Sequence, residues 1–195
     1  AGILGGNYQK NAENITMTEC INYGDNNSEN NDGGFFGSYR GSNFEANRAG
    51  TFKILRCINY GDITVTGNSQ KAGGFIGYYN TNPGTTNDFR YNINYGAVTA
   101  TGGGDTTDVG GFAGHVRMPA SSGYTMYGFV NYGTLSGSQA RAIQNAIGAL
   151  DMKGSNNRYN QKHYGYSNDY TKGNIGSNTT LIETTPDGLC TTLNG

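Results

Sequence analysis

The sequence predicts an all-β protein, a parallel β-solenoid (β-helix) of about four coils with three short strands per coil and a C-terminal capping segment. Asn-Tyr-Gly recurs at residues 22–24, 59–61, 94–96 and 131–133, and a Gly-Gly-Phe string follows the first three copies at 33–37, 73–77 and 110–114. The chain has 33 glycines and only 34% hydrophobic residues, which argues against helices because each interior glycine costs about 1 kcal/mol. Its 15 tyrosines and 8 phenylalanines are too many for a disordered linker.

Each repeat contains three short apolar pieces separated by turn-forming clusters of Gly, Asn, Asp, Ser and Thr, a pattern typical of strands. The piece before Asn-Tyr-Gly carries an apolar residue at equivalent positions: Met17, Ile54, Phe89 and Met126. One coil cannot bury its own apolar face, so the repeats are expected to stack. Stacking sets equivalent residues about 4.8 Å apart, which turns each column of residues into a ladder.

Two ladders follow from the Asn-Tyr-Gly copies. The asparagine ladder consists of Asn22, Asn59, Asn94 and Asn131, and the tyrosine ladder consists of Tyr23, Tyr60, Tyr95 and Tyr132. We expect each asparagine amide to bond the next copy and to satisfy backbone groups of the turn. The glycine after each tyrosine is expected either where φ is positive or where a side chain would collide with the next coil.

The Gly-Gly-Phe strand is expected to point Phe35, Phe75 and Phe112 into the solenoid, where the rings would stack. Side chains alternate along a strand, so this parity turns Ile76 away from the interior.

The fourth copy allows two interpretations between residues 140 and 150. Ile143, Ile147 and Leu150 have helical spacing, which would give a short capping helix. Alignment with the other copies instead sets Ile143 beside Val109 and Ile147 beside Ala113, and we favour this strand.

The repeats divide the chain into a solenoid over residues 1–150 and a C-terminal cap over 151–195. The cap ends in a predicted hairpin of residues 180–184 and 189–193 around the Pro-Asp-Gly turn at 186–188. Such a cap would cover the open edge of the last coil. The opening string at residues 2–5 matches the Gly-Gly-Phe strand, which predicts that the remainder of a longer parent chain lies N-terminal to residue 1.

Charge and hydropathy exclude several partners. Thirteen Lys and Arg balance fourteen Asp and Glu, so the basic surface that nucleic-acid binding needs is missing. No apolar run approaches the roughly 20 residues of a membrane span. Cys20 and Cys57 occupy one column, but in-register strands hold them farther apart than a relaxed disulfide allows, so free, buried thiols are expected.

Tyrosines are the best candidates for ligand binding. Tyr39, Tyr78 and Tyr79 are expected to point out of their strands, and the C-terminal segment adds Arg158, Tyr159, Tyr164 and Tyr166. Aromatic rings beside Asn and Asp suit sugar rings and protein surfaces. The alternative is that these rings stack on one another and shield the coils.

Calcium is the one cofactor for which the sequence offers ligands. Asp25, Asn27, Glu29 and Asp32 supply alternating oxygens in one loop, and Asp105 with Asp108 forms a sparser second candidate. The loop lacks the glycine and the downstream glutamate of a helix-loop-helix calcium site, so a solvated loop is the simpler interpretation.

Catalytic residues are scarce. His115 is expected at the surface and His163 in the packing of the cap, neither beside a nucleophile. The stacked pair Asp25 and Asp62 has a spacing that suits two carboxylates, but its place after Tyr-Gly indicates ordinary turn chemistry.

Gly-Gly-Phe-Ile-Gly at 73–77, together with Cys-Ile-Asn-Tyr-Gly-Asp-Ile-Thr at 57–64, resembles the GLUG-type repeat of extracellular bacterial proteins. That family includes surface proteins of gut Bacteroidetes and streptococcal IgA-cleaving metallopeptidases. The resemblance covers roughly residues 1–150 and implies a secreted or cell-surface location and a non-catalytic role, as a rigid stalk or an adhesive surface for glycan or protein. The alternative is a β-helical polysaccharide-cleaving enzyme, a lyase or glycosidase.

Overall fold

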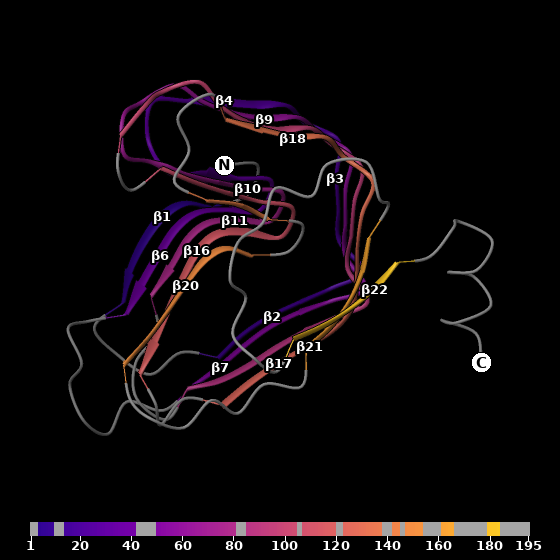
Figure 1. Cartoon of the computed structure of the whole chain (residues 1–195). Coiled ribbons are helices and arrows are strands. Elements are labelled where there is room, and N and C mark those ends of the chain that lie inside the picture. Colours follow the sequence, from indigo (N-terminus) through magenta and orange to yellow (C-terminus); the bar gives the residue numbers. More distant parts are fainter. Residues whose placement is uncertain are drawn as a thin grey trace.

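The described strands wind repeatedly around one axis and stack coil upon coil (Figure 1). The computed structural model describes residues 4–9, 14–41, 50–80, 85–104, 107–119, 123–137, 142–144, 147–153, 161–165 and 179–183. Every regular element in these ranges is a strand, and every strand pairing is parallel. The predicted parallel β-solenoid is therefore confirmed.

The strands repeat in the same order along four coils. The first coil contains β1 (Leu4–Gln9), β2 (Asn14–Thr18), β3 (Ile21–Asn22), β4 (Asn26–Ser28) and β5 (Asp32–Gly33). The second contains β6 (Phe36–Gly41), β7 (Thr51–Leu55), β8 (Ile58–Asn59), β9 (Ile63–Val65) and β10 (Lys71–Gly73). The third contains β11 (Ile76–Asn80), β12 (Thr86–Arg90), β13 (Ile93–Asn94), β14 (Val98–Ala100) and β15 (Asp108–Gly110). The fourth contains β16 (Ala113–Pro119), β17 (Gly123–Asn131), β18 (Leu135–Gly137) and β19 (Ala142–Gln144), and β20 (Ile147–Lys153), β21 (Gln161–Gly165) and β22 (Thr179–Glu183) follow.

Four sheets run along the solenoid, and each is named here by its first strand. The β1 sheet has the order β1-β6-β11-β16-β20, and the β5 sheet contains β5, β10, β15 and β19. The β2 sheet contains β2, β7, β12 and β17 together with β3, β8 and β13, and the β4 sheet contains β4, β9, β14 and β18. Beyond residue 150, β21 pairs with β17 and β22 pairs with β21, so the β2 sheet continues into the segment assigned to the cap.

A full coil is divided more finely than the three strands expected from the sequence. Glu19, Arg56 and Tyr91 have left-handed backbones, with φ of 57°, 54° and 57°, and they separate β2 from β3, β7 from β8 and β12 from β13. A residue with left-handed backbone interrupts a strand, because it departs from the extended conformation in which successive side chains point to opposite faces. One apolar piece of sequence thus becomes two strands that meet at a bend.

The solenoid has two apolar cores because the chain folds back between the β5 and β1 sheets. One core lies between the β1 and β2 sheets and includes Phe36, Phe52, Ile54 and Phe89. The other lies between the β4 and β5 sheets and is built from Ile63, Val65, Ala72, Val98, Ala100, Val109 and Leu135. Figure 1 shows β10 beside β11 at the fold-back. Glycines permit this approach: a Cβ at Gly114 would lie 2.7 Å from the backbone nitrogen of Ala72.

The Gly-Gly-Phe strand follows the prediction only in part. Phe35, Phe75 and Phe112 are fully buried, and their ring centroids stack 5.1 Å apart. The prediction that Ile76 turns away from the interior is wrong, because Ile76 is also fully buried. The chain turns between β10 and β11, and side-chain alternation holds only within one strand.

The fourth copy is a strand, as the alignment of repeats favoured. Ile143 pairs with Val109 in the β5 sheet, and Ile147 pairs with Ala113 in the β1 sheet. The helical interpretation of residues 140–150 is wrong because stacking on the preceding coil satisfies the backbone of these residues. Of the predicted C-terminal hairpin, residues 180–183 of the first arm lie in β22, which pairs in parallel with β21. Residues 184 and 189–193 lie outside the described ranges.

Candidate functional site: an exposed tyrosine face

The asparagine ladder is the buried frame of the site. Nδ2 of Asn22, Asn59 and Asn94 donates to Oδ1 of the asparagine in the next coil, over 2.7, 2.8 and 2.8 Å. The same nitrogen also donates to the carbonyl of the glycine two residues later, for example from Asn59 to Gly61 at 2.8 Å. Each amide therefore joins neighbouring coils and closes its own turn, which leaves the tyrosine between them little freedom.

The glycine after each tyrosine is needed for close approach between coils. None of Gly61, Gly96 and Gly133 has a positive φ. A Cβ on Gly96 would overlap the carbonyl oxygen of Gly61, and a Cβ on Gly133 would overlap that of Gly96. Of the two reasons that the sequence allowed, collision with the adjacent coil is the correct one.

The tyrosine ladder lies on the outside of this frame. Ring centroids are 5.2 Å apart from Tyr23 to Tyr60, 4.9 Å from Tyr60 to Tyr95 and 5.0 Å from Tyr95 to Tyr132, with interplanar angles of 3°, 6° and 11°. Tyr23 is 73% exposed, and Tyr60 and Tyr95 are each 43% exposed. Offset stacking is favourable for aromatic pairs, so the ladder is a continuous aromatic stripe held in one arrangement.

An aliphatic column runs beside the tyrosines on the same face. Strands β3, β8 and β13 turn their asparagine inward and the preceding isoleucine outward: Ile21, Ile58 and Ile93. We call the two outward columns together the tyrosine face: Ile21, Ile58 and Ile93, with Tyr23, Tyr60, Tyr95 and Tyr132. The equivalent residue of the fourth coil, Val130, is buried. In the described residues, the exposed large hydrophobic side chains are Ile21, Tyr23, Tyr60, Tyr91 and Tyr95. Four of these five belong to the tyrosine face, and Tyr91 lies at its border, two residues before Ile93.

Charged residues border the tyrosine face on both sides. Asp25 accepts a hydrogen bond from the backbone nitrogen of Asp62 at 2.8 Å, and Asp62 accepts one from Ala97 at 2.7 Å. These bonds are the turn chemistry that the sequence indicated for the stacked acidic pair. On the other side, Arg56 forms an exposed ion pair with Glu19 at 2.8 Å. The face is thus apolar along its middle and charged at its rims, as in many binding surfaces.

The tyrosines singled out in the sequence lie elsewhere. The expectation that Tyr79 points outward for ligand binding is wrong: its ring is fully buried against Phe52, with centroids 4.9 Å apart, and its hydroxyl donates to Asn87. Tyr79 points into the core because the chain bends at the Gly-Gly-Phe string before β11. On the opposite side of this core lies the β2 sheet, whose Phe52 packs against the Tyr79 ring. Tyr78 is half-buried, with its ring 5.3 Å from that of His115.

For the other predicted ligand residues, the structure describes only the backbone, or the residue lies outside the described ranges. Tyr39 pairs in register with Tyr79, and Tyr164 of β21 pairs with Val130. The side chains of these two, and Arg158, Tyr159 and Tyr166 entirely, lie outside what the structure describes.

The predicted calcium ligands are distributed along the turn rather than gathered. Asp25 and Glu29 are exposed, as is Asn27 in the middle of β4. Asp32 is buried in β5 and accepts a hydrogen bond from the backbone of Gly33 at 2.9 Å. Within the described residues, no three His, Cys, Asp or Glu side chains form a group that would hold a metal ion, so Asp25, Glu29 and Asp32 do not form one.

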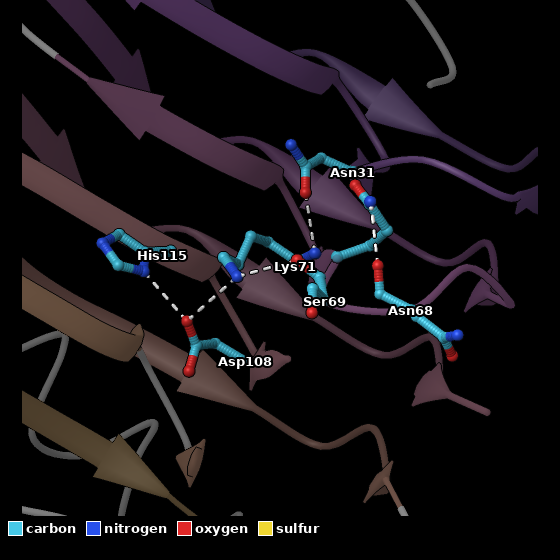
Figure 2. A network of polar contacts seen from close by, with 7 residues as sticks. Asn31, Asn68, Ser69, Lys71, Asp108 and His115 are labelled. Carbon is cyan, nitrogen blue, oxygen red and sulfur yellow. Dashed lines mark hydrogen bonds and ion pairs between the residues drawn. The ribbon is translucent and has the colours of Figure 1, made fainter. Parts of the chain in front are cut away.

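A buried charged cluster lies where the β5 sheet meets the β1 sheet (Figure 2). His115 Nδ1 is 2.9 Å from Asp108 Oδ2, and Lys71 Nζ is 3.6 Å from the same oxygen and donates to the carbonyl of Ser69 at 3.0 Å. His115 is only 6% exposed, so its expected surface position is wrong. The carboxylate of Asp108 holds the imidazole against the β5 sheet, and burial of such charges is tolerated because they are paired.

Sequence reasoning missed this cluster, although a signal for it exists. Lys71 and Asp108 each precede a Gly-Gly-Phe string by two residues, so aligned repeats put opposite charges in one column. His115 lies on β16, the first strand of the next coil, and nothing in the spacing shows that the β5 and β1 sheets pack against each other.

No helix long and apolar enough to cross a membrane occurs among the described residues. Searches of protein-family models, curated proteins and solved structures find nothing that matches the chain.

Proposed function

We propose that this chain is a non-catalytic, extracellular repeat domain that serves as a rigid adhesive surface, with the tyrosine face as its binding site for glycan or protein. The observation that carries the proposal is the tyrosine ladder itself. Most other described aromatic rings are buried in the core, whereas Tyr23, Tyr60 and Tyr95 remain at least 43% exposed. Contiguous exposed apolar surface of this kind is typical of interaction sites.

The construction of the face supports binding. Each ring is held by its neighbours and by the hydrogen-bonded asparagine behind it, so a partner orders few side chains on contact. Such preorganisation lowers the entropic cost of association. Tyrosine adds an apolar ring and a hydroxyl that donates and accepts hydrogen bonds, which suits both glycans and proteins.

The extracellular, cell-surface location belongs to the same proposal. Its support is the resemblance of the Gly-Gly-Phe and Asn-Tyr-Gly strings to GLUG-type repeats, together with a solenoid architecture whose stacked coils suit a rigid stalk. The stacked coils provide that rigidity because each bonds the next through backbone and asparagine ladders.

The test is a binding screen of the purified chain against a microarray of plant and mucin glycans and a panel of purified extracellular-matrix proteins. The variant Tyr60→Ala/Tyr95→Ala removes two central rings and is expected to weaken any specific binding at least tenfold. Its matched control is Thr64→Ala/Thr99→Ala, which changes half-buried outer residues of the same two coils on the β4 sheet. Binding that survives loss of the tyrosines would reject the tyrosine face as the site, and a complete absence of binding to either panel would reject glycans and matrix proteins as its ligands.

The alternative is a polysaccharide-cleaving enzyme, and the Lys71–Asp108–His115 cluster with Tyr78 is the observation in its favour. A histidine oriented by a carboxylate can act as a general base. Burial disfavours this role, since Asp108 is fully buried and the other two side chains are less than 10% exposed. Reducing-sugar and unsaturated-product assays on a polysaccharide panel decide the matter: turnover by the native chain that is lost in His115→Ala would establish the enzyme.

A further inference from the structure

We propose that the partner of the tyrosine face is the same face of a second copy of this chain, packed antiparallel about a two-fold axis. This inference rests on the proposed binding role of the tyrosine face and names its occupant.

The repeat distance of the ladder restricts what can lie along it. The tyrosine centroids recur every 4.9–5.2 Å. An extended peptide places same-face side chains roughly 6.6 Å apart, and an α-helix that advances 5.4 Å per turn falls out of register by about 1 Å over the four rings. A second copy of this solenoid has the same repeat in every coil, so all four rings meet equivalent surroundings.

Ring stacking favours the same kind of partner. Tyr60 and Tyr95 each have a neighbouring ring on both sides, so neither offers a whole free face on which a sugar would stack. The ring edges, the hydroxyls and the isoleucine column are what solvent reaches. Identical ladders pack well on such surfaces because their side chains interdigitate at one spacing.

Charge selects the antiparallel arrangement. The column beside the tyrosines reads Asp25, Asp62, Ala97 and Thr134 from the first coil to the fourth, so its negative charge lies at one end. A two-fold axis that runs along the strands and passes between Tyr60 and Tyr95 opposes each column to itself in reverse order. Asp25 then faces Thr134 of the second copy, and Asp62 faces Ala97.

The same axis also brings apolar side chains of the two copies together in the other columns. Ile58 packs on Ile93 of the second copy, and the tyrosines pack on the tyrosines. Arg56 comes opposite Tyr91 of the second copy, a favourable cation–π pair. A two-fold axis along the solenoid would instead set Asp25 and Asp62 against Ile21 and Ile58, which buries carboxylates against apolar side chains at a cost.

Sedimentation velocity of the purified chain over a dilution series tests the inference. A dimer that dissociates on dilution is expected for the native chain, and Tyr60→Glu is expected to weaken it at least tenfold. Thr64→Glu, in the same coil on the β4 sheet, is the control and should leave the dimer intact. Thermal melts establish that both variants are folded.

A second variant tests the orientation with residues that contribute nothing to the core. Ala97→Asp/Thr134→Asp sets new carboxylates opposite Asp62 and Asp25 in the antiparallel dimer, which should weaken it about tenfold at low salt and less at high salt. A native chain that is monomeric at every concentration overturns the inference, as does a dimer indifferent to Tyr60→Glu. A dimer sensitive to Tyr60→Glu but not to Ala97→Asp/Thr134→Asp overturns the antiparallel arrangement.

These experiments distinguish failure of the dimer from failure of the proposed function. A monomer that binds a glycan or matrix protein through Tyr60 and Tyr95 upholds the proposed function and rejects the second copy. A dimer through the tyrosine face with no binding to either panel upholds the second copy and removes glycan and matrix ligands from the proposal.

Discussion

At the scale of single residues, the glycine after tyrosine leaves no room for a side chain wherever a preceding coil packs against it. A Cβ at Gly96 would overlap the carbonyl oxygen of Gly61, whereas the nearest atom to a Cβ at Gly24 is 3.7 Å away. We therefore expect Gly96→Ala to lower the free energy of unfolding by about 1 to 3 kcal/mol, the range for overpacking. Gly24→Ala should change it by less than about 0.5 kcal/mol. Urea titration of the two variants measures this, and equal losses would contradict the collision.

Cys57 is a second residue whose behaviour follows from its position. It is a free, buried thiol, and burial raises its pKa above the ordinary value of 9.0. Its contribution to stability is fully present below the ordinary thiol pKa and is lost as pH rises through the raised value, because the unfolded chain ionises first. Alkylation by iodoacetamide, followed by mass spectrometry, should be slower at Cys57 in the folded chain than in urea at each pH. Equal rates at neutral pH would show that the thiol is accessible.

At the scale of elements, the turn from β10 to β11 lets two consecutive residues enter the core. Phe75 stacks between Phe35 and Phe112, and Ile76 is buried beside it. Phe75→Ala is expected to cost about 3 to 5 kcal/mol and Ile76→Ala about 2 to 5 kcal/mol. Thr64→Ala, on an outer face, is the control. Guanidinium unfolding midpoints give the comparison, and a silent Ile76→Ala would mean that strict alternation holds after all.

The contact between the β5 and β1 sheets depends on a shared carboxylate. Asp108 pairs with Lys71 within the β5 sheet and with His115 of the β1 sheet across this contact. Asp108→Ala would leave the buried ammonium of Lys71 without its counter-charge, and such losses cost about 3 to 5 kcal/mol. Calorimetric melts should show a much larger effect than Asp88→Ala, whose carboxylate pairs with the partly exposed Arg90. Similar melting shifts for the two variants would show that the buried cluster stabilises no more than a surface pair.

At the scale of the whole molecule, stability comes from ladders that run through every coil. Asn94 lies in the middle of the asparagine ladder, bonded to Asn59, Asn131 and the carbonyl of Gly96. Asn94→Ala is expected to cost about 1 to 3 kcal/mol because it leaves buried polar groups unpaired. Asn27→Ala, at an exposed position of β4, should be nearly silent. Urea unfolding measures the free energy of unfolding of both variants. An unchanged value for Asn94→Ala would mean that the asparagine ladder does not stabilise the fold.

The sequence by itself determined the architecture and the register of this protein, because each copy of Asn-Tyr-Gly and Gly-Gly-Phe repeats the same turn and strand chemistry at nearly constant spacing. That register already contained the asparagine and tyrosine ladders and the strand of the fourth copy. Only the tertiary structure decided that the β5 sheet lies against the β1 sheet, that Tyr79 and His115 are buried and that the tyrosine ladder is the exposed face. The physical reason is that a repeat specifies which residues stack along the axis, where neighbours share one column. Burial across the axis depends on which sheet lies opposite, and that is set by how the whole coil closes around its two cores.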